Sequence, residues 1–159
     1  YIYSSLNNFD KIIVIRFPNV IGPHMTHGLL YDLEKKLKNA NKKIKILGNG
    51  SQRKPYIYVK DLICYIDLLF SKNIKRKINV FNIGPSDKGI TVKKIVNLML
   101  KHYNLKKIVP EYEKKKEGWV GDVTEYSYDN KLIRKTLKIR IPTTKESILR
   151  TINENKKLK

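Results

Sequence analysis

One segment near the start of the chain constrains the fold more than any other. It is the continuous β-branched run Lys11-Ile-Ile-Val-Ile-Arg16, which Pro18, Gly22 and Pro23 bring to an end. A strand that is apolar at every position, without alternation, is typical of a parallel sheet whose two faces are both covered by helices. The run therefore predicts an α/β protein with a buried strand at residues 11–16.

The rest of the chain alternates short apolar strands with amphipathic helices. Helical spacing of apolar residues predicts helices at 29–37, 61–70, 91–103, 130–137 and 144–155. Short apolar runs predict strands at 43–47, 56–59, 80–83 and 108–112. Asp61 and Thr91 are suitable caps for the helices that they open, and Gly48-Asn49-Gly50 predicts a tight turn. Alternating strands and helices favour an α/β architecture.

The net charge of +20 admits a nucleic-acid partner but does not favour one. Lysine supplies 28 of the 34 basic residues and is spread over the whole chain, whereas nucleic-acid readers depend more on the bidentate fork of arginine. A basic nucleic-acid binding module therefore stays the weaker alternative. The same positive field would attract a substrate that carries a diphosphate.

Cysteine content and hydropathy bear on the compartment. The single cysteine, Cys64, cannot form an internal disulfide, which fits a reducing cytoplasm. No apolar stretch approaches the roughly 18 residues of a membrane span, so we expect a cytoplasmic protein with no membrane partner.

Three loops carry polar groups suited to a ligand. Asn19 follows the first strand, at the sheet edge where ligands of open α/β proteins bind. Lys54 or Arg53, after a glycine turn, could neutralise a phosphate. In Gly118-Trp-Val-Gly-Asp-Val123, Asp122 could accept hydrogen bonds from a ribose and Trp119 could cover a ring. Taken singly, each loop is explained slightly better as ordinary surface.

The order of the motifs is more specific than any one of them. R-F-P-N-V-I-G-P at 16–23, G-N-G-S-Q at 48–52, Y-I-Y-V-K-D-L at 56–62, F-N-I-G at 81–84 and G-W-V-G-D-V at 118–123 follow one another along the chain. This series resembles the extended short-chain dehydrogenase/reductase family, and within it the UDP-glucose 4-epimerase and nucleotide-sugar dehydratase group. The resemblance covers residues 11–152. It implies the carboxy-terminal portion of a Rossmann-type parallel sheet plus a smaller α/β substrate-binding domain.

The resemblance also implies ligands and the residues that bind them. The cofactor would be NAD, with the backbone at Pro18 passing the nicotinamide. The substrate would be a UDP- or dTDP-sugar, and the full-length protein would be a homodimer. Residues expected to contact the substrate are Asn19, Gly28, Leu29 and Lys54 at the diphosphate, Lys45, Ile46 and Leu47 at the base, and Asp122 and Trp119 in the last loop.

The same resemblance divides the chain into two parts. We expect residues 1–23 and 56–90 to pack with the Rossmann sheet, and residues 24–55 and 91–159 to form the nucleotide-sugar domain. Two positions depart from the family pattern, because Lys54-Pro55 replaces an Arg-Asp pair and Trp119 replaces an arginine. These departures keep open a second possibility, a non-catalytic nucleotide-sugar binding protein.

The catalytic residues of the family are expected upstream of Tyr1. Its Tyr-x-x-x-Lys pair precedes the strand that ends at Arg16, and its glycine-rich cofactor loop follows an earlier strand; neither is found at its place in these 159 residues. The four pairs with this spacing are accidental matches, given the lysine content: Tyr31/Lys35, Tyr56/Lys60, Tyr103/Lys107 and Tyr112/Lys116. We also expect no metal site at His24 and His27, which lack neighbouring cysteines or carboxylates. The parent enzyme would oxidise and re-reduce the sugar C4, and this chain alone would be inactive.

Overall fold

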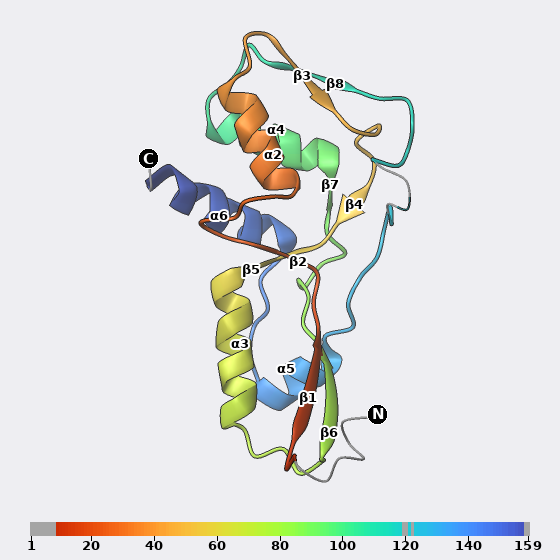
Figure 1. Ribbon diagram of the computed structural model, residues 1–159, viewed down its shortest axis with the longest axis vertical. Coiled ribbons are helices and arrows are strands. Elements are labelled where there is room, and N and C mark those ends of the chain that lie inside the picture. Colours follow the sequence, from red (N-terminus) through yellow and green to blue (C-terminus); the bar gives the residue numbers. More distant parts are fainter. Residues whose placement is uncertain (1–8, 119–120, 122, 158–159) are drawn as a thin grey trace.

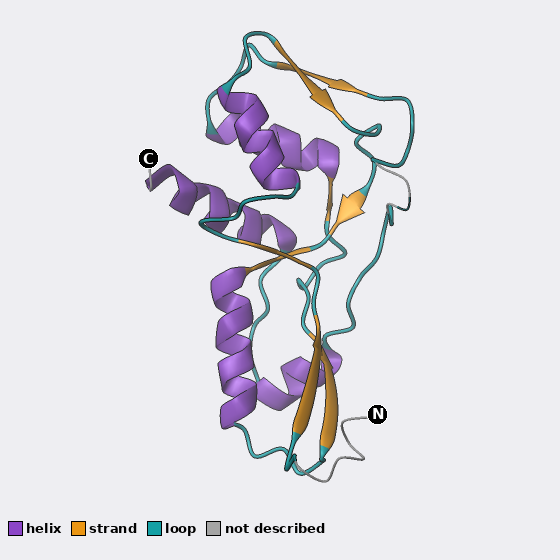
Figure 2. Cartoon of the chain, in the orientation of Figure 1, coloured by secondary structure: helices purple, strands orange, loops and turns teal. Residues whose placement is uncertain are grey.

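The computed structural model describes residues 9–118, 121 and 123–157 of the 159-residue chain. The molecule is elongated and has a lower part, an upper part and a junction between them (Figure 1). Most helices of the upper part lie on one side of its strands (Figure 2). The mixture of helices with mainly parallel strand pairs confirms the predicted α/β class.

The lower part is built on two parallel strands. β1 (Ile12–Arg16) pairs with β6 (Ile78–Asn82), and α3 (Val59–Ser71) and α5 (Lys131–Leu137) pack beside them. Its core consists of buried apolar side chains from these elements and from the residues just before α3, just after β6 and after α5: Ile57, Leu62, Tyr65, Leu69, Phe81, Ile83, Ile133 and Ile141.

The upper part places two helices against a second parallel pair. α2 (Leu29–Lys38) and α4 (Val92–His102) pack on each other, and β3 (Lys43–Ile46) pairs with β8 (Val109–Tyr112). Its core is larger and contains Leu30, Leu33, Ile44, Ile46, Ile95, Val96 and Met99 among others. Thr91 caps α4 as predicted, because its hydroxyl accepts a hydrogen bond from the Lys94 amide at 3.3 Å.

Short strands and one long helix form the junction. β2 (Asn19–Ile21) runs parallel to β5 (Tyr56–Tyr58), and β4 (Arg53–Lys54) runs antiparallel to β7 (Ile90–Thr91). α6 (Thr144–Lys157) contacts β5 and β2, and its Ile148 and Ile152 belong to the upper core. The segments that join the two parts are therefore held by both sheet pairing and helix packing.

Two predictions about local structure are wrong. The strand at 11–16 is not buried on both faces, since Val14 is 42% exposed and its neighbour Val80 is 40% exposed. The physical reason is that, within the part of the chain that the structure describes, α3 and α5 leave the face with Val14 and Val80 uncovered. Asp61 is not a cap, because α3 begins two residues earlier at Val59, and Asp61 instead accepts a hydrogen bond from Arg150.

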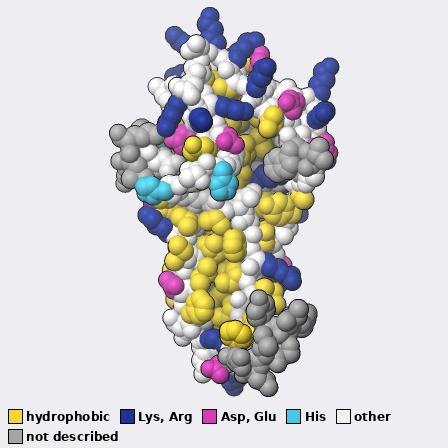
Figure 3. Space-filling model, in the orientation of Figure 1, with side chains coloured by type: hydrophobic (Ala, Val, Ile, Leu, Met, Phe, Trp, Pro, Cys, Tyr) yellow, Lys and Arg dark blue, Asp and Glu magenta, His cyan; other side chains and the backbone are white. Residues whose placement is uncertain are grey.

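The two parts differ in surface character. Hydrophobic side chains gather on the lower part over β1 and β6, whereas Lys and Arg side chains gather around the upper part (Figure 3). Among the described residues, no helix combines the length and apolar character needed to cross a bilayer.

Candidate functional site

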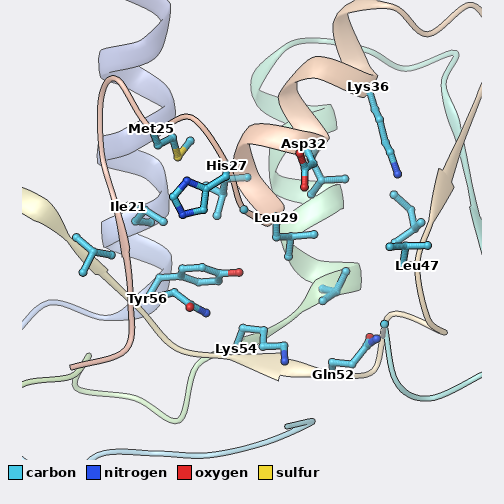
Figure 4. A pocket seen from close by; sticks show the side chains of 18 residues that line it. Ile21, Met25, His27, Leu29, Asp32, Lys36, Leu47, Gln52, Lys54 and Tyr56 are labelled. Atoms are coloured by element: carbon cyan, nitrogen blue, oxygen red, sulfur yellow. The ribbon is translucent and has the colours of Figure 1, made fainter. Parts of the chain in front are cut away.

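The main cavity of the described residues lies where the upper part meets the junction. It has a volume of about 550 Å³ and is walled by the start of α2, the end of β3, the strand β4 and the paired strands β2 and β5. Figure 4 shows side chains from these four regions pointing toward a common space. Segments from residues 19 to 118 therefore contribute to one site.

Asn19 enters the site from the carboxyl end of the lower sheet. It starts β2, whose parallel pairing sets Asn19 opposite Tyr56 in the register. Both residues line the cavity, and Asn19 is exposed to it whereas Tyr56 is 4% exposed. The Asn19 amide thus offers a donor and an acceptor at the junction end of the cavity.

The amino terminus of α2 opens onto the same cavity. Gly28 takes the cap position with φ of 95°, and no side chain caps the helix there. The first-turn amides of such a helix have no intrahelical acceptor, so an anion can occupy the position that a capping side chain would fill. Gly28 and Leu29 both line the cavity, which places this electropositive end at its wall.

Lys54 brings a positive charge to the floor of the cavity. Its side chain is 7% exposed, and its Nζ donates a hydrogen bond of 2.8 Å to the Val123 carbonyl. Glycine is required opposite, because Gly89 has φ of 80° and an added Cβ would lie 2.5 Å from the Lys54 carbonyl. The close approach of β4 and β7 therefore fixes the backbone from which Lys54 extends.

Arg53, the neighbouring cation, is directed elsewhere. Its Nη1 donates to the Gly89 carbonyl at 3.0 Å and its Nε lies 3.5 Å from the Glu125 carboxylate. It does not line the cavity. Of the two cations that the sequence offered for a phosphate, the structure brings only Lys54 to the site.

The end of β3 supplies an apolar wall. Ile46 and Leu47 line the cavity, whereas the Lys45 side chain is exposed and does not line it. Lys45 and Ile46 are neighbours within β3, where successive side chains point to opposite faces, whereas Leu47 follows the end of the strand. The Lys45 carbonyl accepts a hydrogen bond of 2.8 Å from Lys36, which also lines the cavity.

Six of the ten predicted site residues meet at this cavity: Asn19, Gly28, Leu29, Ile46, Leu47 and Lys54. Pro18 is buried just before β2 and does not line the cavity, and neither does Lys45. Trp119 and Asp122 lie outside the described residues. Gly118 lines the cavity, and Val123 binds Lys54, so the described ends of that loop adjoin the site.

Several lining residues were missed by the sequence analysis. Gln52 is 2% exposed and lies two residues before Lys54, so strand alternation puts both on one face and could have indicated it. His27 lines the cavity, while His24 borders a separate hollow beside Tyr31. The residues before α2 show no helical or strand periodicity, so nothing in the sequence indicated that His27 rather than His24 would line the cavity.

The family of the chain follows from a comparison with family models. Residues 3–84, more than half of the chain, match the model described as the NAD dependent epimerase/dehydratase family. The chain belongs to this family. NAD is accordingly the cofactor of the enzyme family to which the chain belongs. No curated protein sequence matches the chain significantly.

Solved structures of epimerases share the fold. UDP-glucose 4-epimerase of Thermotoga maritima, solved with UDP-glucose, is 25% identical, with a TM-score of 0.71 over 92% of this chain and 47% of that one. UDP-N-acetylglucosamine 4-epimerase of Methanobrevibacter ruminantium is 17% identical, with a TM-score of 0.77 over 100% of this chain and 51% of that one. UDP-glucuronic acid 4-epimerase of Bacillus cereus, solved with UDP-glucuronic acid and NAD, is 20% identical, with a TM-score of 0.74 over 99% of this chain and 49% of that one. The chain spans about half the length of each.

Proposed function

We propose that the chain is the carboxy-terminal, substrate-binding portion of an NAD-dependent epimerase or dehydratase that acts on a nucleotide-diphosphate sugar. One observation carries the proposal: a single cavity combines a cation, an uncapped helix amino terminus and an apolar wall. This combination suits a ligand with a charged diphosphate next to an aromatic base.

The diphosphate is assigned to the polar end of the cavity. Lys54 supplies a positive charge from a residue that is 7% exposed, and the α2 amides and Asn19 supply hydrogen-bond donors. Charge-assisted hydrogen bonds of this kind are stronger than neutral ones. The lysines around the upper part would raise the local concentration of such an anion.

The base is assigned to the opposite wall. Ile46 and Leu47 would cover its ring, and burying the 55% exposed Leu47 side chain would add to the binding free energy. The predicted contacts of Asp122 with the ribose and of Trp119 with a ring belong to the same proposal. Lys45, whose side chain faces away, would contribute backbone only.

The reaction class is proposed from the family and from the relative with 25% identity, a UDP-glucose 4-epimerase. In this class NAD supplies the reversible acceptance of hydride from the sugar C4. The described residues of this chain offer NAD little beyond the backbone near Pro18, at the carboxyl end of β1, where such cofactors bind in α/β sheets. Residues 24–55 and 91–159, apart from α5 and the segment after it, which pack in the lower part, would hold the sugar nucleotide and leave the hydride chemistry to another part of the enzyme.

That other part would cover the exposed apolar face of β1 and β6. Val14, Phe17, Ile78 and Val80 are 36% to 46% exposed there, which is unusual for a strand pair of this composition. We propose that residues 1–23 and 56–90 pack against the cofactor-binding half of the sheet through this face. The homodimer that the family resemblance implies would form only with that half present.

Calorimetry and an activity assay test the proposal. The 159-residue chain is expected to bind UDP-glucose and to show no 4-epimerase turnover, because the family's Tyr-x-x-x-Lys pair and glycine-rich loop are not found at their places in its sequence. Failure of the chain to bind any UDP- or dTDP-sugar would contradict the assignment of the cavity. Turnover of UDP-glucose by the chain alone would contradict the assignment of catalysis to another part.

A further inference from the structure

Gln52 is a buried polar side chain that the assignments above do not use. It is 2% exposed, lines the cavity, and its Oε1 has no hydrogen-bond partner among the described residues. Its own backbone is fixed, because the Gln52 carbonyl accepts a hydrogen bond of 2.9 Å from the Val92 amide. A buried acceptor left without a donor raises the free energy of the folded state, and a ligand that supplies the donor removes this penalty.

The glycine turn holds the Gln52 amide in place. Gly48 has φ of 72°, and a Cβ added there would lie 2.0 Å from the Gln52 Nε2, so the amide packs directly on the Gly48 backbone. Glu113 holds the Gly48 backbone through two hydrogen bonds. Its Oε2 accepts one from the Gly48 amide at 3.1 Å, and its own amide donates the other to the Gly48 carbonyl at 3.0 Å. With Nε2 against the turn, Oε1 is the atom of the amide that has no hydrogen-bond partner among the described residues.

The surroundings of Gln52 suit a planar base. Figure 4 shows Gln52 next to Lys54 on the floor of the cavity and below Leu47. Ile46, Leu47 and Val92 line the same cavity and provide apolar contact, while Lys54 marks the diphosphate end. A ring between these apolar side chains would meet one directional polar group, the Gln52 amide.

We propose that the Gln52 Oε1 accepts a hydrogen bond from the N3–H group of a uracil or thymine base and thereby selects that base. The inference rests on the proposed binding of a UDP- or dTDP-sugar. In such a nucleotide N1 carries the ribose, so N3–H is the one N–H donor on the ring. The contact would be made at a side chain that is 2% exposed, and a missing partner costs the most where water has little access.

A ligand-and-residue cycle tests the hydrogen bond. Binding of UDP and of N3-methyl-UDP is measured by calorimetry for the unaltered chain and for Gln52→Met, which keeps the length of the side chain and removes the acceptor. We expect methylation to weaken binding to the unaltered chain about tenfold. Gln52→Met should bind UDP about tenfold more weakly and no longer distinguish UDP from its methylated form.

Arg53→Met is the matched control, since Arg53 adjoins Gln52 in sequence but does not line the cavity. It should retain the discrimination of the unaltered chain. Equal binding of UDP and N3-methyl-UDP by the unaltered chain would overturn the inference and leave the proposed function standing. A methylation penalty that persists in Gln52→Met would also overturn it, because another group would then meet N3–H.

Two further outcomes separate the inference from its premise. Absence of UDP binding by the unaltered chain would overturn both the inference and the proposed function. If circular dichroism shows that Gln52→Met does not fold, the comparison of the two ligands on the unaltered chain decides alone: discrimination supports the inference and equal binding overturns it.

Discussion

Replacement of Lys54 by methionine should weaken nucleotide-sugar binding more than any other single loss of charge at the cavity. The aliphatic stem is kept, so packing against β4 and β7 changes little, and only the ammonium group is removed. Lys54 as a whole is 7% exposed, which limits the screening of its charge by solvent. A hydrogen bond to a charged group contributes about 1.5–3 kcal/mol. We therefore expect UDP-glucose to bind Lys54→Met about 30-fold more weakly, equivalent to about 2 kcal/mol.

The assay is calorimetric titration at two salt concentrations, with the melting temperature of each variant measured alongside. Lys43→Met is the control, because Lys43 pairs with Glu111 at 2.6 Å on an exposed surface away from the cavity. It should change affinity by less than about twofold. Lys54→Arg keeps the charge and should retain most of the affinity. Binding by Lys54→Met within twofold of the unaltered chain, with unchanged melting temperature, would refute the assignment of Lys54 to the diphosphate.

Two further predictions concern the scaffold. Gly89→Ala should lower the free energy of unfolding in urea by about 2 kcal/mol or more, since φ of 80° is strained for alanine and its Cβ would overlap the Lys54 carbonyl. Gly121→Ala, with φ of 84° and nothing within 4 Å of the added Cβ, should cost less, and equal costs would contradict the overlap argument. Hydrogen bonds from Thr143, together with Arg140, lower the pKa of Glu146 from 4.5 to about 2. A carboxylate whose pKa is lower in the folded state stabilises that state at pH values above its unfolded-state pKa. The unaltered chain should therefore be more stable than Glu146→Gln by the full difference above about pH 5, and the difference should vanish as the pH falls toward 2. A pH-independent difference in melting temperature between the two would contradict this cause.

Local structure was largely predictable because it depends on local pattern. The helix over residues 92–102 follows from apolar spacing and from the hydroxyl of Thr91. The strand at 43–46 follows from its apolar residues, and its alternation already implied that Lys45 and Ile46 face opposite ways. This alternation leaves only the backbone of Lys45 for the predicted contact with a base.

Pairing between distant segments was not predictable in the same way. The Gly48-Asn49-Gly50 segment predicted a tight turn but not the partners of the strands beside it: β3 pairs with β8 and β4 pairs with β7. Nothing in the local sequence names those partners, because pairing depends on how the whole chain packs. The order of five motifs supplied the family, but the direction of the Arg53 side chain depends on Gly89 and Glu125, which no local pattern indicates.

The exposure of β1 was misjudged for a related reason. A continuous apolar run indicates a strand that is buried on both faces in the complete protein. Among the described residues, α3 and α5 lie beside the β1–β6 pair, and Val14 and Val80 remain exposed. The composition of the strand agrees with the proposal that another half of the enzyme covers this face.

The most direct test of the account is the map of amide chemical-shift changes in ¹⁵N-labelled chain titrated with UDP-glucose. The account predicts saturable changes concentrated at Asn19, at Gly28 and Leu29, at Lys54 and at Gly118, which come from four separate segments that meet at one cavity. Changes confined to the β1–β6 face, or no saturable change at these residues, would contradict the claim that this cavity binds a nucleotide-diphosphate sugar.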